Sequence, residues 1–163
     1  MRRVLTILSV AVGTSLAGCS HSRVVTADPP PLDALGAPPD GLAQICVLRP
    51  HSLGALLTGP VRDNGLLMGA TRGPSYFCYL AHPGPHRVTS HTDRDRTLAV
   101  LLRPGETLFL QQQVRIGADR FFPIPAAEAA ALLARCDYSL LIDTDGEEPA
   151  PEAPADGPAA PAQ

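Results

Sequence analysis

The sequence lacks several features that common classes of protein need. Its 163 residues include no tryptophan and only 4% aromatic residues, and all 13 basic residues are arginine. The formal net charge of −3 excludes a nucleic-acid binder of the usual kind, because such a protein needs a cationic face to displace counterions. No uninterrupted apolar stretch reaches the roughly 18 residues of a membrane-spanning helix. The length allows one globular domain.

The N-terminus carries a targeting signal. Two arginines precede the apolar segment 4–12, which is too short to span a bilayer but has the length of a secretory signal. This segment runs into Leu16-Ala17-Gly18-Cys19, which resembles the lipobox of bacterial lipoproteins. The resemblance implies a signal peptide over 1–18, a diacylglycerol on the Cys19 thiol and a fatty acid such as palmitate on the new amino terminus. Ser20 at the next position implies export to the periplasmic face of the outer membrane.

Composition divides the rest of the chain into three parts. Residues 19–42 are rich in proline and predict a semi-rigid linker that follows the lipidated cysteine. Residues 143–163 hold six acidic residues among alanines and prolines and predict a disordered tail, for which solubilisation is favoured over docking on a basic partner. All seven aromatic residues fall between 76 and 138, which places the folded domain at 43–142.

The domain has the turn pattern of an all-β fold. Apolar or alternating segments are expected as strands, and they are separated by turns rich in proline and glycine. Asn64-Gly65 predicts a hairpin turn, because both residues tolerate a positive φ. The spacing predicts a small antiparallel β-sandwich of about seven strands. The expected strands are 43–49, two within 61–70, 75–81, 86–91, 97–102 and 107–116, with 138–142 as a final edge strand.

One helix is expected among the strands. Pro125 suits a first helical position, and residues 126–135 are almost all helix formers. Ala129, Leu132, Leu133 and Cys136 share a narrow apolar face, which we expect to pack over the sheet.

Turn residues also carry a resemblance to a known family. Pro83-Gly84-Pro85-His86 and, about 20 residues later, Arg103-Pro104-Gly105-Glu106-Thr107 resemble small bacterial lipoproteins whose domain is catalogued as one of unknown function. The segment Gly73-Pro74-Ser75-Tyr76-Phe77 and the helix also fit that pattern, and the turns are similar to the PEGA repeat of envelope proteins. The resemblance implies a transthyretin-like sandwich in the envelope and no catalytic residue.

Three cysteines remain once Cys19 is lipidated. An oxidising compartment favours one disulfide and one buried thiol, and three pairings are open among Cys46, Cys78 and Cys136. A bridge between the strands of Cys46 and Cys78 would stabilise the fold by about 3–4 kcal/mol. Three buried thiols that act as small hydrophobes are the alternative.

The candidates for chemistry are few. His82, His86 and His91 lie close in sequence, but no fourth residue has metal-ligand spacing, so no metal site is expected. The segment 91–96 alternates charges and is expected to be a solvated loop. Serine-nucleophile, zinc-protease and phosphate-loop motifs are missing, so we expect no catalytic residue and no cofactor.

These observations favour a non-enzymatic lipoprotein of the cell envelope that acts as a structural or binding module. Its expected partners are the membrane lipid, through Cys19, and a ligand that the sequence does not identify. Two alternatives stay open: a small periplasmic enzyme or metal-dependent factor that uses the region of His82, His86 and His91, and an adaptor for peptidoglycan or for another protein.

The anchor gives the first prediction. Cells that express the full chain and are fed a labelled fatty acid should label this protein, and Cys19→Ser should abolish the label because only the thiol accepts the diacylglycerol. Labelled protein is detected by immunoprecipitation, with Cys136→Ser as the matched control that keeps its label. Equal labelling of the Cys19→Ser protein and the unaltered chain would contradict the anchor.

Overall fold

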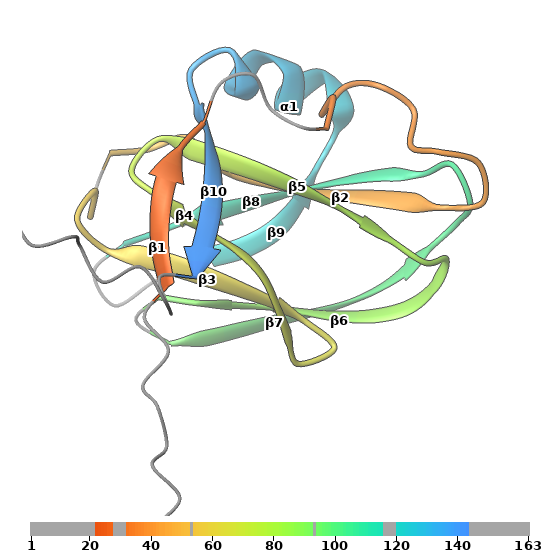
Figure 1. The fold of residues 1–163 in the computed structure, drawn as a ribbon, viewed down its shortest axis with the longest axis horizontal. Coiled ribbons are helices and arrows are strands. Elements are labelled where there is room, and N and C mark those ends of the chain that lie inside the picture. The colour runs from red at the N-terminus through yellow and green to blue at the C-terminus, as the bar shows by residue number, and fades with distance from the viewer. Residues whose placement is uncertain (1–21, 28–31, 53, 93, 116–119, 144–163) are drawn as a thin grey trace, which may run out of the picture.

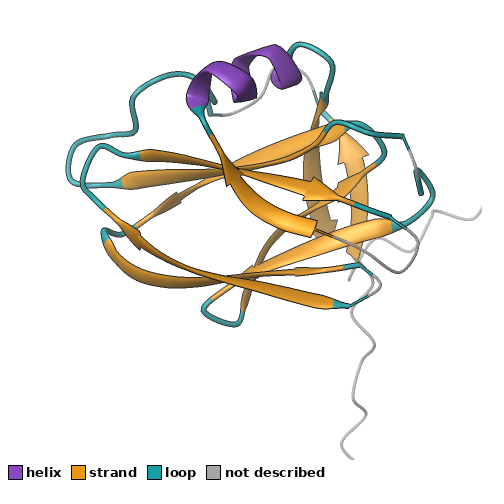
Figure 2. Cartoon of the chain, turned by 180° about the vertical axis from the view of Figure 1, so that it is seen from behind, coloured by secondary structure: helices purple, strands orange, loops and turns teal. Residues whose placement is uncertain are grey.

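The computed structural model describes residues 22–27, 32–52, 54–92, 94–115 and 120–143. These residues form ten strands and one helix, arranged as a β-sandwich of two sheets with the helix on one outer face (Figures 1 and 2). The expected all-β fold with one helix is confirmed. In order, the elements are β1 Ser22–Thr26, β2 Ala43–Arg49, β3 Thr58–Asp63, β4 Leu66–Arg72, β5 Ser75–Ala81, β6 Gly84–His91, β7 Asp95–Leu102, β8 Thr107–Gln113, β9 Arg120–Ile124, α1 Ala126–Leu133 and β10 Asp137–Asp143.

The two sheets differ in size and in strand direction. The larger has the order β1-β10-β5-β2-β8-β9 and the smaller β4-β3-β6-β7. All pairs in the smaller sheet are antiparallel, whereas β2 runs parallel to β8 and β10 runs parallel to β5. The expectation of a purely antiparallel sandwich is therefore wrong for the larger sheet. The two parallel pairs arise because long connections return the chain to the same end of the sheet.

Strand β2 lies at the centre of the larger sheet and is buried at all seven positions. Its odd-numbered side chains, such as Ile45 and Val47, face the smaller sheet, where they pack with residues such as Val61 and Val88. Its even-numbered side chains face the opposite way, because side chains alternate along a strand. Leu48 on that face packs under the helix.

The helix covers the outer face of the larger sheet. Ala129 and Leu132 of α1 are buried and pack against Leu48 and Phe109, so the expected apolar face does meet the sheet. Figure 2 shows α1 lying across the strands on the side away from the smaller sheet. Pro125, expected at the first helical position, is instead the N-cap residue with extended backbone, so the helix begins one position later than expected.

The sulfur atoms of Cys46 and Cys78 are joined under this helix. The two residues lie directly opposite each other on the antiparallel strands β2 and β5, with their Cα atoms 4.1 Å apart. The disulfide therefore joins strands β2 and β5 on the face of the larger sheet that α1 covers.

Some polar side chains are buried in the sandwich and form hydrogen bonds there. Gln112 of β8 bonds to Thr71 of β4 and donates from Nε2 to Ser90 Oγ of β6 at 2.7 Å. Gln112 is the one polar position on an otherwise apolar face, and these bonds satisfy its buried amide. Arg49 is also buried and donates to the carbonyl oxygens of Leu57 and Gly54 at 2.7 and 2.6 Å.

The N-terminal part of the expected linker is folded. Residues Ser22–Thr26 form β1, which pairs along its whole length with β10, from Ser22 opposite Asp143 to Thr26 opposite Ser139. The linker expected over 19–42 is thus wrong for these residues, as it is for Ala34, which is buried in the layer under α1. Strand β10 is consequently interior to the sheet and is not the expected edge. Cys19 and residues 144–163 lie outside the described residues.

Other boundaries differ less. The hairpin at Asn64-Gly65 is confirmed, with φ of 49° and 88° at the two residues. The expected strand 107–116 ends at Gln113. Strand β9, which has a proline at its fourth position, was missed along with β1, so the expected number of strands was too low.

The disulfide gives the second prediction. In the mature chain carrying Cys19→Ser, the additional double change Cys46→Ala and Cys78→Ala should lower the free energy of unfolding by about 3–4 kcal/mol, since the bridge constrains the unfolded chain. Urea unfolding followed by circular dichroism measures this. Cys136→Ser in the same background is the control and should change stability by less than about 1 kcal/mol. Identical urea midpoints with and without reductant would contradict the bridge.

Candidate functional site

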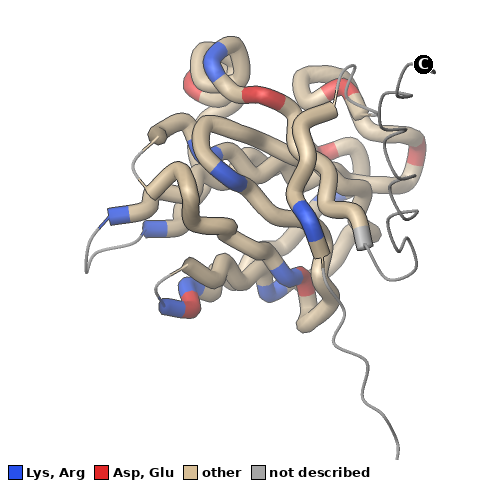
Figure 3. The backbone as a smooth tube through the Cα atoms, turned by 60° about the vertical axis from the view of Figure 1, so that its left-hand side comes forward, with Lys and Arg blue, Asp and Glu red and all other residues tan. Residues whose placement is uncertain are grey.

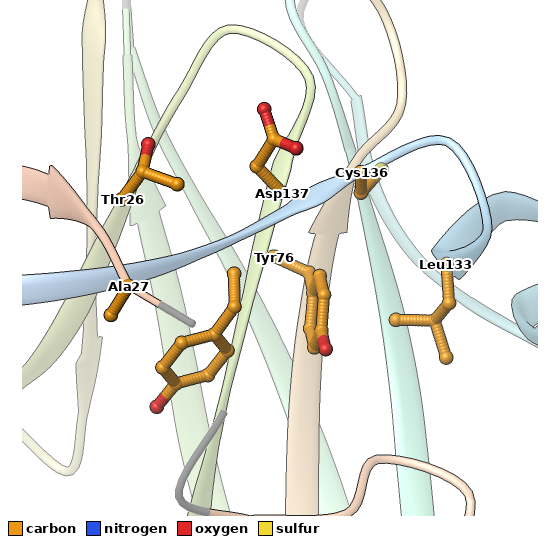
Figure 4. A pocket seen from close by; sticks show the side chains of 7 residues that line it. Thr26, Ala27, Tyr76, Leu133, Cys136 and Asp137 are labelled. Carbon is orange, nitrogen blue, oxygen red and sulfur yellow. The ribbon is translucent and has the colours of Figure 1, made fainter. Parts of the chain in front are cut away.

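The candidate site is a cleft of about 420 Å³ beside the end of the helix. It lies where β10 leaves β5: the two strands pair only at Asp137 opposite Ser75 and at Tyr138 opposite Tyr76. Figure 4 shows the cleft from close by. Its lining residues come from β1, β5, β10 and the end of α1 and are Thr26, Ala27, Tyr76, Leu133, Cys136, Asp137 and Tyr138.

Backbone hydrogen bonds hold the rim of this cleft. The amide of Cys136 donates to the carbonyl of Leu133 at 3.1 Å, which closes the last turn of the helix. The amide of Asp137 donates to the carbonyl of Pro74, and that of Ala27 donates to the carbonyl of Tyr138. These bonds hold the main chain in place around the cleft.

Two tyrosine rings form one wall. The ring centroids of Tyr76 and Tyr138 lie 5.4 Å apart with their planes at 70°, an edge-to-face arrangement. Burial, and secondarily the neighbouring Tyr76, raises the pKa of Tyr138. Its hydroxyl is therefore neutral at physiological pH and can act as hydrogen-bond donor or acceptor. In Figure 4, Asp137 lies on the opposite side of β10 from the Tyr76 ring.

Cys136 is the free cysteine among the described residues, and its thiol lines the cleft. Burial raises the pKa of Cys136 to about 11; Arg135 opposes this shift and Asp137 adds to it. Because the thiolate is the nucleophilic form, a thiol with this pKa is a poor nucleophile at neutral pH. The cleft can bind through aromatic and hydroxyl groups but contains no activated cysteine.

The structure does not bring the three singled-out histidines into one site. Nδ1 of His86 lies 2.7 Å from Oδ2 of Asp63, and Nε2 of His86 lies 2.8 Å from the carbonyl oxygen of His82. His91 contacts Asp95 across the turn between β6 and β7. In these contacts His82 takes part through its backbone carbonyl and not through its ring. Both ring nitrogens of His86 have a hydrogen-bond partner.

Asp63 is the buried partner in this group. Its Oδ2 also accepts from the Tyr79 hydroxyl at 3.4 Å, and Asp63 is only 6% exposed. Burial is the largest cause that raises the pKa of Tyr79, and the charge of Asp63 and the hydrogen bond to it act in the same direction. Asp63, Tyr79 and His86 thus form a polar cluster at the end of the sandwich interior.

The described ranges lack both a cluster of metal ligands and a membrane-spanning helix. Within them, no three His, Cys, Asp or Glu side chains gather in a group that could hold a metal ion. The segment 91–96 was expected to be a loop, but His91 ends β6 and Asp95 and Arg96 begin β7, so the expectation is wrong for these residues. None of the helices in this part of the chain is long and apolar enough to cross a bilayer.

Comparisons with protein-family models, with curated proteins and with solved structures found no match to this chain. The resemblance to small envelope lipoproteins therefore stays a prediction.

Sequence reasoning missed the cleft. Tyr76 and Tyr138 stood out only as markers of the core, and they are 62 positions apart in the chain. Their meeting depends on the short parallel contact between β5 and β10, for which the sequence has no local signal. The sequence placed Cys136 just after the helix, and this was its one indication of a residue that lines the cleft.

The half-buried thiol of Cys136 gives the third prediction. Alkylation of Cys136 by iodoacetamide should be slow at pH 8 in the folded protein and should rise with a midpoint near pH 11, because burial raises its pKa from about 9. At pH 8 the folded protein should hold about a hundredfold less thiolate than the urea-unfolded chain. Mass spectrometry of the Cys19→Ser protein measures the rate. A folded-state midpoint near pH 9 would contradict the burial of the thiol.

Proposed function

We propose that this protein is a lipid-anchored, non-enzymatic lipoprotein of the cell envelope whose body is a ligand-binding module. The observation that carries the anchor is the lipobox-like segment Leu16-Ala17-Gly18-Cys19 directly after an apolar leader. Its proposed location is the periplasmic face of the outer membrane. The module is the sandwich with its helix, and its proposed ligand site is the cleft between Tyr76 and Tyr138.

The chemistry of the cleft supports binding over catalysis. Its volume lies within the range of about 300–1,000 Å³ that is usual for small-molecule sites. Two aromatic rings, an apolar floor at Leu133 and hydroxyls at Thr26 and Tyr138 are groups that bind without reacting. The nearest nucleophile, Cys136, stays protonated, and the engaged His86 belongs to a separate cluster.

The proposed ligand class is a peptidoglycan fragment, which makes the adaptor interpretation a specific form of the binding module. Aromatic rings present flat apolar faces to sugar rings, and the tyrosine and threonine hydroxyls offer partners to sugar hydroxyls. Envelope proteins at the proposed location meet this polymer.

Binding at the cleft gives the fourth prediction. Soluble disaccharide-peptide fragments of peptidoglycan, added to the mature Cys19→Ser protein, should shift backbone amide signals of Thr26, Tyr76 and Tyr138 in NMR spectra. The change Thr26→Trp should weaken binding about tenfold, because the indole fills a cleft of this size.

The matched control is Thr97→Trp, which places the same side chain on an exposed position of β7 far from the cleft. Binding to this variant should equal binding to the parent protein. An equal loss of binding in both variants, or shifts confined to residues outside the cleft, would contradict the assignment of the cleft as the ligand site.

A further inference from the structure

The distance from the anchor to the folded body is short. Strand β1 begins at Ser22, three positions after Cys19. A fully extended chain advances at most about 3.6 Å per residue, so Ser22 lies within about 11 Å of the lipidated cysteine. Ser22 is itself paired with Asp143, the first of five rungs that bind β1 to β10. With the proposed lipid on Cys19, the body is therefore tethered close to the bilayer. The semi-rigid linker expected over residues 19–42 would have held it farther away.

The point of attachment lies at one end of the sandwich. Figure 1 shows β1 and β10 crossing this end nearly at right angles to the other strands. Both cross near β4, and Ser139 Oγ of β10 donates to the carbonyl of Ala70. The same end holds the last residue of β4, the turn between β6 and β7, and the start of β9, as the pairings Thr58 with Arg72 and His91 with Asp95 place them. We call it the anchored end.

Exposed arginines gather at the anchored end. Arg23 follows the first residue of β1, Arg72 ends β4, Arg94 lies in the β6–β7 turn, and Arg120 begins β9. Figure 3 brings this end forward; blue segments are spread over the left and lower parts of that view, while most red segments lie toward the top and right. Three acidic residues, Asp95, Asp137 and Asp143, lie at this end as well, and Asp95 contacts His91.

We propose that the anchored end is a docking surface for the phosphate headgroups of an anionic bilayer. The inference rests on the proposed function, because the lipid on Cys19 brings this end to the membrane. Guanidinium groups match phosphate geometry and keep their charge at all physiological pH values. Charges within about 10 Å of a surface escape most of the screening at 0.1 M salt, so arginines on the end of the body that the tether holds at the membrane can attract the headgroups.

The absence of native tryptophan allows a direct test. The full chain, expressed with its own leader and purified from membranes, carries one introduced tryptophan and is reconstituted into vesicles of phosphatidylethanolamine, phosphatidylglycerol and brominated phosphatidylcholine. Thr58→Trp places the reporter at the anchored end, and Leu101→Trp places it on an exposed position near the other end. The bromine atoms should quench Thr58→Trp at least about threefold more than Leu101→Trp.

Charge removal separates docking from mere tethering. The double change Arg72→Gln and Arg120→Gln should reduce the quenching of Thr58→Trp on anionic vesicles. The double change Arg87→Gln and Arg103→Gln removes the same charge away from the anchored end and should leave quenching unchanged. Replacing phosphatidylglycerol with neutral lipid should have the effect of the first double change.

Flotation of the vesicles distinguishes failure of the docking surface from failure of the anchor. Protein that floats but is quenched equally at both reporters, or responds equally to both double changes, overturns the docking surface and leaves the anchor intact. Protein that does not float with the vesicles overturns the anchor, and the docking surface with it.

Discussion

The central constraint in this structure is that β2 is buried on both of its faces. A strand in this position needs a cover on each side, and the chain supplies two different ones: the four-stranded sheet on one face and a single short helix on the other. The disulfide between Cys46 and Cys78 lies on the helix side, in the same buried apolar layer as Ala129 and Leu132 of α1. Strand β8 pairs in parallel with β2 and completes the buried centre of the sheet.

The helix that covers β2 also creates the cleft. Because α1 has only eight residues, it ends before the edge of the sheet, and the chain turns back at Cys136 to enter β10. Strand β10 pairs briefly with β5 and then crosses the end of the sandwich, where β1 joins it. The tyrosine wall lies at this divergence. The half-buried thiol of Cys136 and the pairing of β1 with β10 are consequences of the same path of the chain.

Hydrogen bonds between polar side chains link the two sheets near both ends of the sandwich. Gln112 links strands of both sheets near one end, and Asp63 with Tyr79 and His86 does so near the other. Buried groups of this kind need their partners, since an unpaired buried polar atom costs about 1–3 kcal/mol. His86, which is prominent in the sequence beside two other histidines, therefore has an architectural explanation. The structure separates it from His91 because residues of opposite parity on a strand point to opposite faces.

The sequence by itself determined the features that depend on local physics. Prolines and glycines marked the turns, alternating apolar residues marked most strands, Asn64-Gly65 marked a hairpin, and the alanine-rich run after Pro125 marked the helix. Only the tertiary structure decided what lies beside what: that Ser22–Thr26 is a strand, that β10 is interior, and that Tyr76 meets Tyr138. A five-residue segment within a proline-rich stretch carries no signal of its own, and becomes a strand because the exposed edge of β10 is available to pair with it. Contacts between residues far apart in the chain depend on the order of strands, and strand order depends on how every face of the sheet is covered at once.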